Sequence, residues 1–291
     1  MAYNVPLKIS PDFSQREYIS ITPKDAAWEY LYFAARKISR GQSWISSSDE
    51  NEMVVVLLGG VAEIRSSRES WQEVGRRPDV FSGMPYAVYI PRQTEFEVIA
   101  KSNELDLGYG WTQTNQDHPM QLITPEMIDI DIRGGDNVTR QINNIVPPGF
   151  DCHKLVAVEV YTPSGNWSSY PPHKHDHHQV DENGKLIEAD LEEIYFYKID
   201  KPTGFAYQRI YTDDGKIDEL LLVKDNELVL SPEGYHPVVS APGNNTYYLN
   251  FLAGSAQALS ASDDPDFAWV KETYTTKDPR VPLVTMEMEK E

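Results

Sequence analysis

Residues 53–64 read MVVVLLGGVAEI, a run of β-branched and aliphatic residues that two glycines divide. A short apolar run bounded by glycine is typical of a buried strand, and the second part alternates as a half-buried strand does. Similar runs occupy residues 155–160, 194–197 and 219–223, and most of the 20 prolines and 17 glycines lie between such runs. Many short strands separated by turn residues predict an all-β chain folded as sandwiches or barrels. Helix signals are scarce, with residues 25–31 and the C-terminal tail as weak candidates.

The size and composition suit one large or two medium globular domains, since the chain has 291 residues of which 40% are hydrophobic. Cys152 is the only cysteine, so no disulfide can form within the chain and a reducing compartment is expected. The N-terminal residues lack the apolar core of a signal peptide, and no apolar run approaches the roughly 20 residues of a membrane span. We therefore expect a cytoplasmic protein.

The formal net charge is −19. A surface of this sign repels phosphate backbones and anionic lipids, which argues against nucleic acid and membranes as partners. The charge is compatible with a small-molecule ligand and with a homo-oligomer. An anionic ligand would need local arginine, lysine or a metal ion to overcome the same field.

Two segments of the chain resemble each other, namely YIPRQTEFEVIA at residues 89–100 and LSPEGYHPVVSA at residues 230–241. Setting Pro91 on Pro232 places Glu95 on His236, and an apolar-aromatic strand follows each segment after a polar turn. The repeat predicts two related domains, residues 1–145 and residues 146–291. Because Glu95 stands where His236 stands and no histidine precedes His118, we expect no histidine-based metal site in the first domain.

Five of the seven histidines lie between residues 173 and 236, at His173, His175, His177, His178 and His236. Side chains alternate along a strand, so the His-x-His pair at residues 173–175 would point both imidazoles to one face. Two carboxylates open the strand at residues 192–197, and His236 precedes another strand. Borderline divalent metals favour neutral imidazole with carboxylate. The plainer alternative is a solvated polar loop, but the combination of pair, carboxylate and distant histidine favours a metal site.

The order His-x-His, Glu, His resembles the cupin metal motifs, with a longer gap at residues 176–192. The Asn-Gly pair at residues 183–184 predicts a hairpin within that gap, at the mouth of a barrel. Longer strings are similar to the 5-deoxy-glucuronate isomerase family, which are bicupin relatives of the 5-keto-4-deoxyuronate isomerases: GNWSSYPPHKHD at 165–176, LEEIY at 191–195, GFAYQRIYT at 204–212 and GYHPV at 234–238. The similarity extends along nearly the whole chain and includes RQINNI at residues 140–145.

This resemblance implies an all-β bicupin fold with two cupin-type β-barrels and one divalent metal ion, whether Zn, Mn or Fe. The ligands that it implies are His173, His175, Glu193 and His236. Glu193 is preferred to Glu192 because the related motif places its glutamate directly before an aliphatic-aromatic pair. Period two then directs Tyr195 and Tyr197 to the ligand face and Glu192 away from it. The chain departs from the family at Gln257 and Phe267, which bears on the choice of substrate.

The implied reaction converts 5-deoxy-D-glucuronate to 5-dehydro-2-deoxy-D-gluconate in myo-inositol catabolism, and it needs an acid-base residue as well as the metal. The base stays open among Glu192, Lys174, Tyr195 and Tyr248. We expect Arg209 to bind the substrate carboxylate, although a structural ion pair is the equal alternative. Three other functions remain open, namely an isomerase of a related keto-deoxyuronate, a cupin dioxygenase and a non-catalytic sugar-acid sensor.

Three further residues are expected to be structural. Arg76 and Arg77 would serve the fold or a subunit contact. Cys152 lies next to His153, but no third group that could orient a catalytic pair is evident, so a buried thiol is the favoured interpretation.

Overall fold

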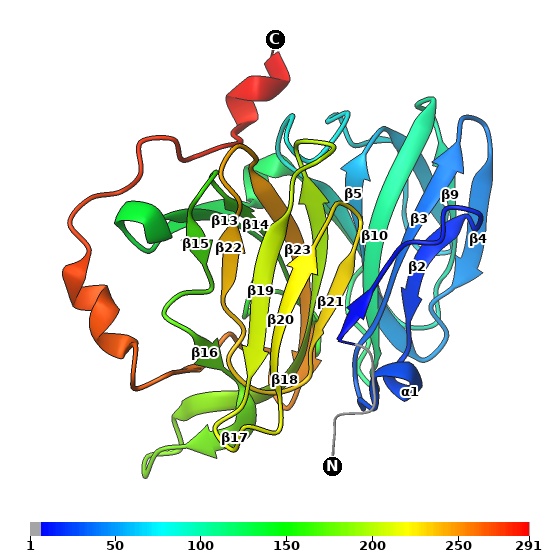
Figure 1. The fold of residues 1–291 in the computed structure, drawn as a ribbon. Helices are drawn as coiled ribbons and strands as arrows, with labels where there is room; N and C mark the ends of the chain where they lie inside the picture. Colours follow the sequence, from blue (N-terminus) through cyan, green and yellow to red (C-terminus); the bar gives the residue numbers. More distant parts are fainter. Residues whose placement is uncertain (1–6, 291) are drawn as a thin grey trace.

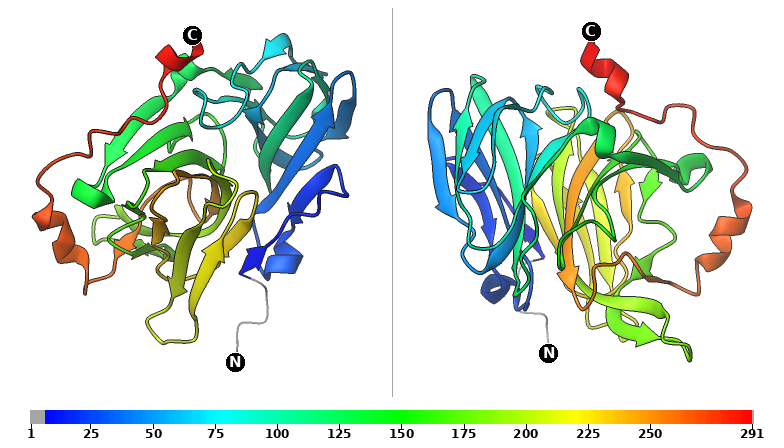
Figure 2. Two further views of the ribbon diagram at one scale, coloured as in Figure 1. Left: turned by 45° about the horizontal axis from the view of Figure 1, so that its top comes forward. Right: turned by 180° about the vertical axis from the view of Figure 1, so that it is seen from behind.

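The computed structural model describes residues 7–290, so the N-terminal residues on which the signal-peptide expectation rests lie outside it up to residue 6. The described chain is almost entirely β-structure, which confirms the all-β prediction. Figure 1 shows two barrel-like units side by side, the first in blue to cyan and the second in green to orange. The two further views in Figure 2 show the same arrangement. No helix in the described part of the chain is long and apolar enough to span a membrane.

The first unit is built from two antiparallel sheets. One sheet has the strand order β11 (Gln121–Ile123), β8 (Tyr86–Ile90), β5 (Asn51–Gly59), β10 (Glu104–Gln113), β3 (Tyr32–Ser39) and β2 (Glu17–Ile21). The other has the order β4 (Ser43–Ser47), β9 (Glu95–Ala100), β6 (Ala62–Ser66) and β7 (Ser70–Val74). The run at residues 53–64 therefore forms most of β5 and the start of β6, on opposite walls of one barrel.

The second unit repeats this plan. Its larger sheet has the order β1 (Lys8–Ile9), β21 (Leu228–Ser231), β18 (Leu186–Ile199), β23 (Thr246–Gly254), β14 (Val156–Thr162), β13 (Arg140–Val146) and β12 (Asp129–Arg133). The smaller sheet has the order β15 (Trp167–Ser168), β22 (Val238–Ser240), β19 (Ala206–Tyr211) and β20 (Asp218–Val223). In addition, β17 (Asp176–Val180) pairs with β18, and β16 (His173–Lys174) pairs with β24 (Ser262–Asp263).

The internal repeat is confirmed by the strand orders. The order β2-β3-β10-β5-β8 in the first unit matches β13-β14-β23-β18-β21 in the second, and β4-β9-β6-β7 matches β15-β22-β19-β20. The predicted division between residues 145 and 146 falls at the end of β13. β12 pairs with β13, and β13 pairs with β14 of the second unit. We therefore propose that the second unit begins before Asp129.

Helical turns are few and short. The described ones are α1 (Pro23–Ala26), η1 (Pro125–Met127), η2 (Asp136–Val138), η3 (Ala268–Thr273) and η4 (Met286–Lys290). Figures 1 and 2 show the segment after β24, which carries η3, running along the outer side of the second barrel and away from the first.

The larger sheets of the two units pack back to back, and the alternation of β5 shows how. Val54, Val56 and Leu58 belong to the core between the units, whereas Val55 and Leu57 belong to the core inside the first barrel. The contact between sheets is close, because a Cβ on Gly108 would lie 2.9 Å from Leu249 and one on Gly110 would lie 2.5 Å from Phe251. These two glycines thus permit the sheets to approach.

A buried ion pair also joins the units. The Arg77 guanidinium donates to both carboxylate oxygens of Glu159 on β14, at 3.1 and 3.0 Å, and both side chains are buried. A fully paired guanidinium and carboxylate satisfy each other where a single charge would be costly. Arg77 therefore serves the fold, as predicted.

Candidate metal centre

Three buried side chains of the second barrel converge on one point. His175 precedes β17, Glu193 lies on β18 and His236 precedes β22, and one ligand atom from each lies within 4.8 Å of the others. The Glu193 Oε2 atom is 3.0 Å from His175 Nε2 and 3.3 Å from His236 Nε2. Three of the four predicted ligands are thus brought together by segments that are far apart in the sequence.

Local backbone geometry explains how the sequence delivers these groups. Period two along β18 directs Glu193, Tyr195 and Tyr197 into the barrel, where the two tyrosines belong to its buried core. Before β22 the chain turns at Gly234, whose φ is +87° and where a Cβ would lie 2.3 Å from a backbone oxygen. Glycine is required at that turn, and the turn presents His236 to the barrel interior.

The hydrogen bonds of the imidazoles fix which ring nitrogen faces the centre. His175 Nδ1 lies 2.9 Å from the Leu191 carbonyl oxygen and His236 Nδ1 lies 2.8 Å from that of Gly234. A carbonyl oxygen only accepts, so each Nδ1 carries a hydrogen and Nε2 remains for the centre. A carbonyl oxygen that accepts the Nδ1 hydrogen commonly fixes the ring orientation of a metal-binding histidine in this way. His236 Nε2 is moreover buried without a hydrogen-bond partner among the described residues, which fits a ligand atom.

His173, the fourth predicted ligand, lies next to this group. Its ring centroid is 5.0 Å from that of His236, and its Nδ1 faces the Pro171 carbonyl oxygen at 3.3 Å. The side chain lines the same cavity as His175 and Glu193. Its role as a ligand stays a prediction.

The ionisation of these groups suits a cation. Burial alone would raise the pKa of Glu193, but the hydrogen bond with His175 and the nearby His236 imidazole lower this pKa to about 2. Burial and the nearby His236 lower the pKa of His173 to about 3. Burial opposes the charged form of His175, but the hydrogen bond with Glu193 outweighs it and raises the pKa of His175. An ionised carboxylate facing two Nε2 atoms requires a proton or a metal ion between them.

A small cavity of about 90 Å³ adjoins the centre and is lined by His173, His175 and Glu193. The Tyr195 hydroxyl donates to Glu193 Oε2 at 3.3 Å, and the Tyr248 hydroxyl is hydrogen-bonded to Ser168 and lies 3.4 Å from Ser169 Oγ. A larger cavity of about 600 Å³ adjoins it, and the two share five lining residues: Arg133, Arg140, His173, Leu259 and Ala261. The larger cavity therefore forms the mouth of the site.

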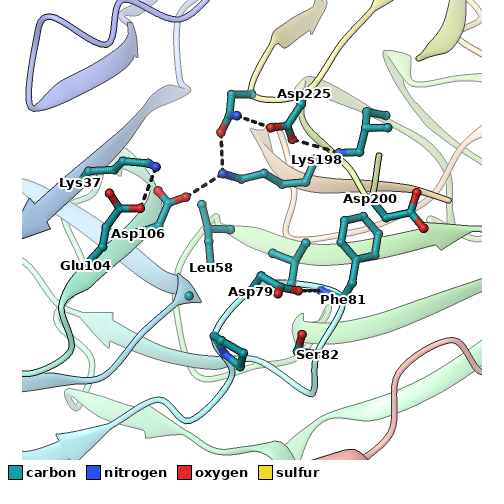
Figure 3. A pocket seen from close by; sticks show the side chains of 15 residues that line it. Lys37, Leu58, Asp79, Phe81, Ser82, Glu104, Asp106, Lys198, Asp200 and Asp225 are labelled. Atoms are coloured by element: carbon teal, nitrogen blue, oxygen red, sulfur yellow. Dashed lines mark hydrogen bonds and ion pairs between the residues drawn. The ribbon is translucent and has the colours of Figure 1, made fainter. Parts of the chain in front are cut away.

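Another cavity, of about 490 Å³, lies between the two units and is drawn in Figure 3. Both of its lysines are paired, since Lys37 pairs with Glu104 at 2.8 Å and Lys198 pairs with Asp106 at 2.6 Å. Three further carboxylates, Asp79, Asp200 and Asp225, leave its lining acidic. Lys198 also donates to Asn226. No histidine or cysteine is among the described residues that line it. The group placed to hold a metal ion among the described residues is instead His175, Glu193 and His236, so the candidate site belongs to the histidine-lined cavity.

Arg209 lies outside the site, contrary to the expectation that it binds substrate. Alternation along β19 turns Gln208 and Ile210 inward and Arg209 outward. Its side chain is 45% exposed, its Nε donates to Asp218 at 2.8 Å and its guanidinium lies over the Tyr211 ring. The structural ion pair, which the sequence left as the alternative, describes this residue.

Glu192 also lies outside the site. Its carboxylate faces the first unit and accepts three backbone N–H groups, from Glu29 at 2.5 Å, Tyr30 at 2.9 Å and Leu31 at 2.7 Å. Burial outweighs these hydrogen bonds and raises the pKa of Glu192. Glu192 is thus a contact between the units, and its place among the catalytic residues was wrong.

The other candidates divide between the cavity and the surface. Tyr248 and Tyr195 line the cavity, whereas the ammonium group of Lys174 is paired with Asp213 at the surface. The hairpin predicted for residues 176–192 is confirmed by the pairing of β17 with β18. His177 and His178 lie on its exposed part.

Gln257 and Phe267, which differ from the family pattern, lie in different parts of the second unit, and Cys152 contacts the first of them. Gln257 donates to Phe150 O and Cys152 Sγ and accepts the Gly149 N–H, in the loop between β13 and β14. Phe267 lies near Tyr170, with ring centroids 6.2 Å apart, beside the mouth. Burial raises the pKa of the Cys152 thiol, which agrees with an unreactive side chain.

Two residues at the mouth were missed by the sequence analysis. Arg140 lines both cavities, and Tyr274 lines the larger one. Arg140 belongs to the RQINNI string, but nothing in its local pattern indicates a site. Tyr274 comes from the segment after β24, more than 80 residues from the His-x-His pair.

Comparison with known proteins identifies the family. The model of the KduI/IolB family matches residues 7–270. A curated 5-deoxy-glucuronate isomerase from Geobacillus thermodenitrificans is 41% identical over 256 residues, which are 88% of this chain and 91% of that protein. One from Bacillus subtilis strain 168 is 34% identical over 87% of this chain and 92% of that protein. The chain therefore belongs to the KduI/IolB family.

Solved structures agree on the architecture. An IolB-like protein from Salmonella typhimurium LT2 is 33% identical and superposes with a TM-score of 0.86, covering 91% of this chain and 99% of that one. Bacillus subtilis oxalate decarboxylase is only 10% identical, with a TM-score of 0.61 over 89% of this chain and 79% of that one. The latter likeness concerns the fold alone, and together they confirm the bicupin fold.

Proposed function

We propose that this member of the KduI/IolB family is a metal-dependent 5-deoxy-glucuronate isomerase that acts in myo-inositol catabolism. The reaction is the conversion of 5-deoxy-D-glucuronate to 5-dehydro-2-deoxy-D-gluconate, an aldose–ketose isomerisation. The observation that carries the proposal is the buried group of His175, Glu193 and His236 in a chain that is 41% identical to a 5-deoxy-glucuronate isomerase over 88% of its length.

The residues that would hold the metal ion are His175, Glu193 and His236, with His173 as a fourth ligand. A divalent ion in this place would supply Lewis-acid stabilisation of the negative charge that builds on the substrate carbonyl oxygen. Imidazole and carboxylate ligands fit Zn, Mn and Fe alike. The backbone carbonyls of Leu191 and Gly234 hold two of the imidazoles in the orientation that this requires.

The proton that moves between neighbouring carbons needs a side chain within the cavity. Tyr248 and Tyr195 are the candidates, because both hydroxyls line it. Burial raises the pKa of both hydroxyls, so they are protonated at neutral pH and serve as donors to the substrate oxygens. Tyr248 is the stronger candidate for the acid that protonates a substrate oxygen, since its hydrogen bonds with Ser168 and Ser169 give its proton a route of exchange.

The test is direct. The purified protein, loaded in turn with Zn, Mn or Fe(II), is incubated with 5-deoxy-D-glucuronate and followed by proton NMR. We expect the ketose signals to appear, and we expect a chelator to abolish turnover and added metal to restore it. Conversion of a keto-deoxyuronate with no conversion of 5-deoxy-D-glucuronate would assign the related isomerase activity instead. Oxygen uptake in an electrode cell would favour a dioxygenase.

A further inference from the structure

Four cationic side chains line the larger cavity, at Arg133, Arg140, Lys271 and Lys277, together with one acidic side chain, Asp263. We call these four residues the cationic mouth. In a chain with a net charge of −19, such a concentration of positive charge opposes the field of the rest of the molecule. It adjoins the cavity that contains the candidate metal ligands, since both are lined by His173.

Three of the four cations are already engaged. Arg133 pairs with Asp131 at 3.0 Å, Lys271 pairs with Asp263, and Lys277 donates to the carbonyl oxygen of Gly134. Arg140 differs, since no hydrogen bond or ion pair joins its guanidinium to any other group among the described residues. The side chain is nevertheless only partly exposed. A half-buried guanidinium with five free donors is unfavourable unless a ligand completes it.

A second unused donor lies beside the same cavity. The Tyr274 hydroxyl is buried and has no hydrogen-bond partner within the described chain, and Tyr274 lines the cavity together with Arg140. Its position is fixed by the residues that follow it, because Asp136 accepts the backbone N–H of Thr275 at 3.0 Å and binds the hydroxyl of Thr276 at 2.9 Å. Tyr274 is therefore held against the barrel at the edge of the cavity.

We propose that Arg140, assisted by the Tyr274 hydroxyl, binds the carboxylate of the open-chain sugar acid. This inference rests on the proposed function and specifies how that site selects a uronate. The guanidinium fork matches the two oxygens of a carboxylate, and a tyrosine hydroxyl supplies one further hydrogen bond. Arg140 lines both cavities, so a substrate whose carboxylate contacts it extends its other end toward the histidine group. A neutral aldose would leave the guanidinium unpaired and is disfavoured for that reason.

The test separates recognition of the carboxylate from catalysis. Binding to the metal-free protein is measured by calorimetry with two inert probes, 2-deoxy-D-gluconate and 2-deoxy-D-glucitol, which differ in carrying a carboxylate or a hydroxymethyl group. Arg140→Gln is compared with Arg209→Gln, a matched control that changes the net charge equally at an exposed ion pair on the outer face of β19. We expect Arg140→Gln to weaken binding of the acid by about 10- to 100-fold, the scale of a charged hydrogen bond. Binding of the alcohol should not change, and Arg209→Gln should bind both probes as the wild type does.

Two further variants keep the test decisive if Arg140→Gln folds poorly. Arg140→Lys keeps the charge but not the fork and should retain an intermediate affinity for the acid. Tyr274→Phe removes one donor and should weaken binding of the acid by about threefold to tenfold. Equal affinity of the wild type for acid and alcohol would overturn the proposal, as would unchanged affinity for the acid in Arg140→Gln and Tyr274→Phe. If the wild type binds the acid through Arg140 but does not isomerise 5-deoxy-D-glucuronate, the proposed function fails while the carboxylate site stands.

Discussion

Replacing Glu193 by Gln should lower metal affinity, whereas replacing its neighbour Glu192 by Gln should lower the free energy of unfolding. The two residues are neighbours on β18 and differ in the face that they present. Glu193 contacts His175 and His236 within the second barrel, whereas Glu192 accepts backbone N–H groups of the first unit. The same chemical change at adjacent positions should therefore have two different results.

The size of each effect follows from these contacts. In Glu193→Gln the centre loses its only carboxylate, and we expect metal affinity to fall by at least about 100-fold, since loss of an outer-shell partner alone costs roughly 10–100-fold. In Glu192→Gln the amide oxygen can replace only one carboxylate oxygen. The amide NH₂ then faces the N–H of Glu29 or those of Tyr30 and Leu31, and we expect a loss of about 1.5–3 kcal/mol in the free energy of unfolding.

Two measurements are needed for each variant. Metal content is measured by mass spectrometry after dialysis against a weak chelator. Thermal unfolding is measured with the metal removed, so that loss of metal does not contribute to the melting temperature. We expect Glu192→Gln to retain metal and to melt about 3–10 °C lower than the wild type. The assignment of the two carboxylates would be refuted if Glu193→Gln kept full metal occupancy, or if Glu192→Gln lost metal without a loss of stability.

Three further results are expected. His236→Ala and His173→Ala should lower metal content, measured on the purified variants, at temperatures where both remain folded; full occupancy in both would contradict the ligand set. Metal occupancy should fall as the pH is lowered through the pKa of His175, which is raised, because the proton and the metal compete for Nε2; a pH titration with a metal indicator that shows no such fall would exclude His175. In the metal-free protein, Glu193 and His175 make the free energy of unfolding depend on pH in opposite directions. The stability that Glu193 contributes is complete above its unfolded pKa and is lost as the pH falls toward about 2. The stability that His175 contributes is present at low pH and is lost as the pH rises through its raised pKa. Finally, Glu52→Gln should lower the melting temperature much as Glu192→Gln does, since Glu52 accepts the backbone N–H groups of His153, Lys154 and Leu155 at 2.6–3.0 Å; an unchanged melting temperature would refute this.

The fold and the convergence of His175, Glu193 and His236 could be predicted because both depend on local periodicity. The run at residues 53–64 forms two strands with the expected glycine break, and alternation along β18 correctly directs Glu193 and Glu192 to opposite faces. The His-x-His pair needed only a short extended segment to bring both rings near His236. Period two and turn geometry are properties of a few neighbouring residues, so the sequence carries them.

The missed and misassigned residues depend on contacts between distant segments. The segment around Arg209 contains the polar Gln208, which is buried and accepts a hydrogen bond from the Tyr197 hydroxyl. Gln208 and Arg209 are both polar, so the alternation of apolar and polar residues that would identify the inward face of β19 is absent there. Arg140 becomes a candidate only when the segment after β24 brings Tyr274 to it. No local pattern encodes such an encounter.

The internal repeat gives a physical reason why one barrel could carry chemistry while the other supports the fold. The alignment of Pro91 with Pro232 also aligns Tyr109 with Asn250. Tyr109 pairs with Val55 on β5, and Asn250 pairs with Tyr195 on β18. Val55 therefore corresponds to Tyr195, Met53 to Glu193 and Glu52 to Glu192. The outward carboxylates have the same role in both units, since each accepts three backbone N–H groups of the other unit. The inward positions differ, because Met53 packs in an apolar core whereas Glu193 meets two histidines. A change on the inward face leaves the contact between the units intact, because alternation separates the two faces of a strand. The second barrel can therefore keep a polar interior while the back-to-back sheets and the paired carboxylates maintain the two-barrel structure.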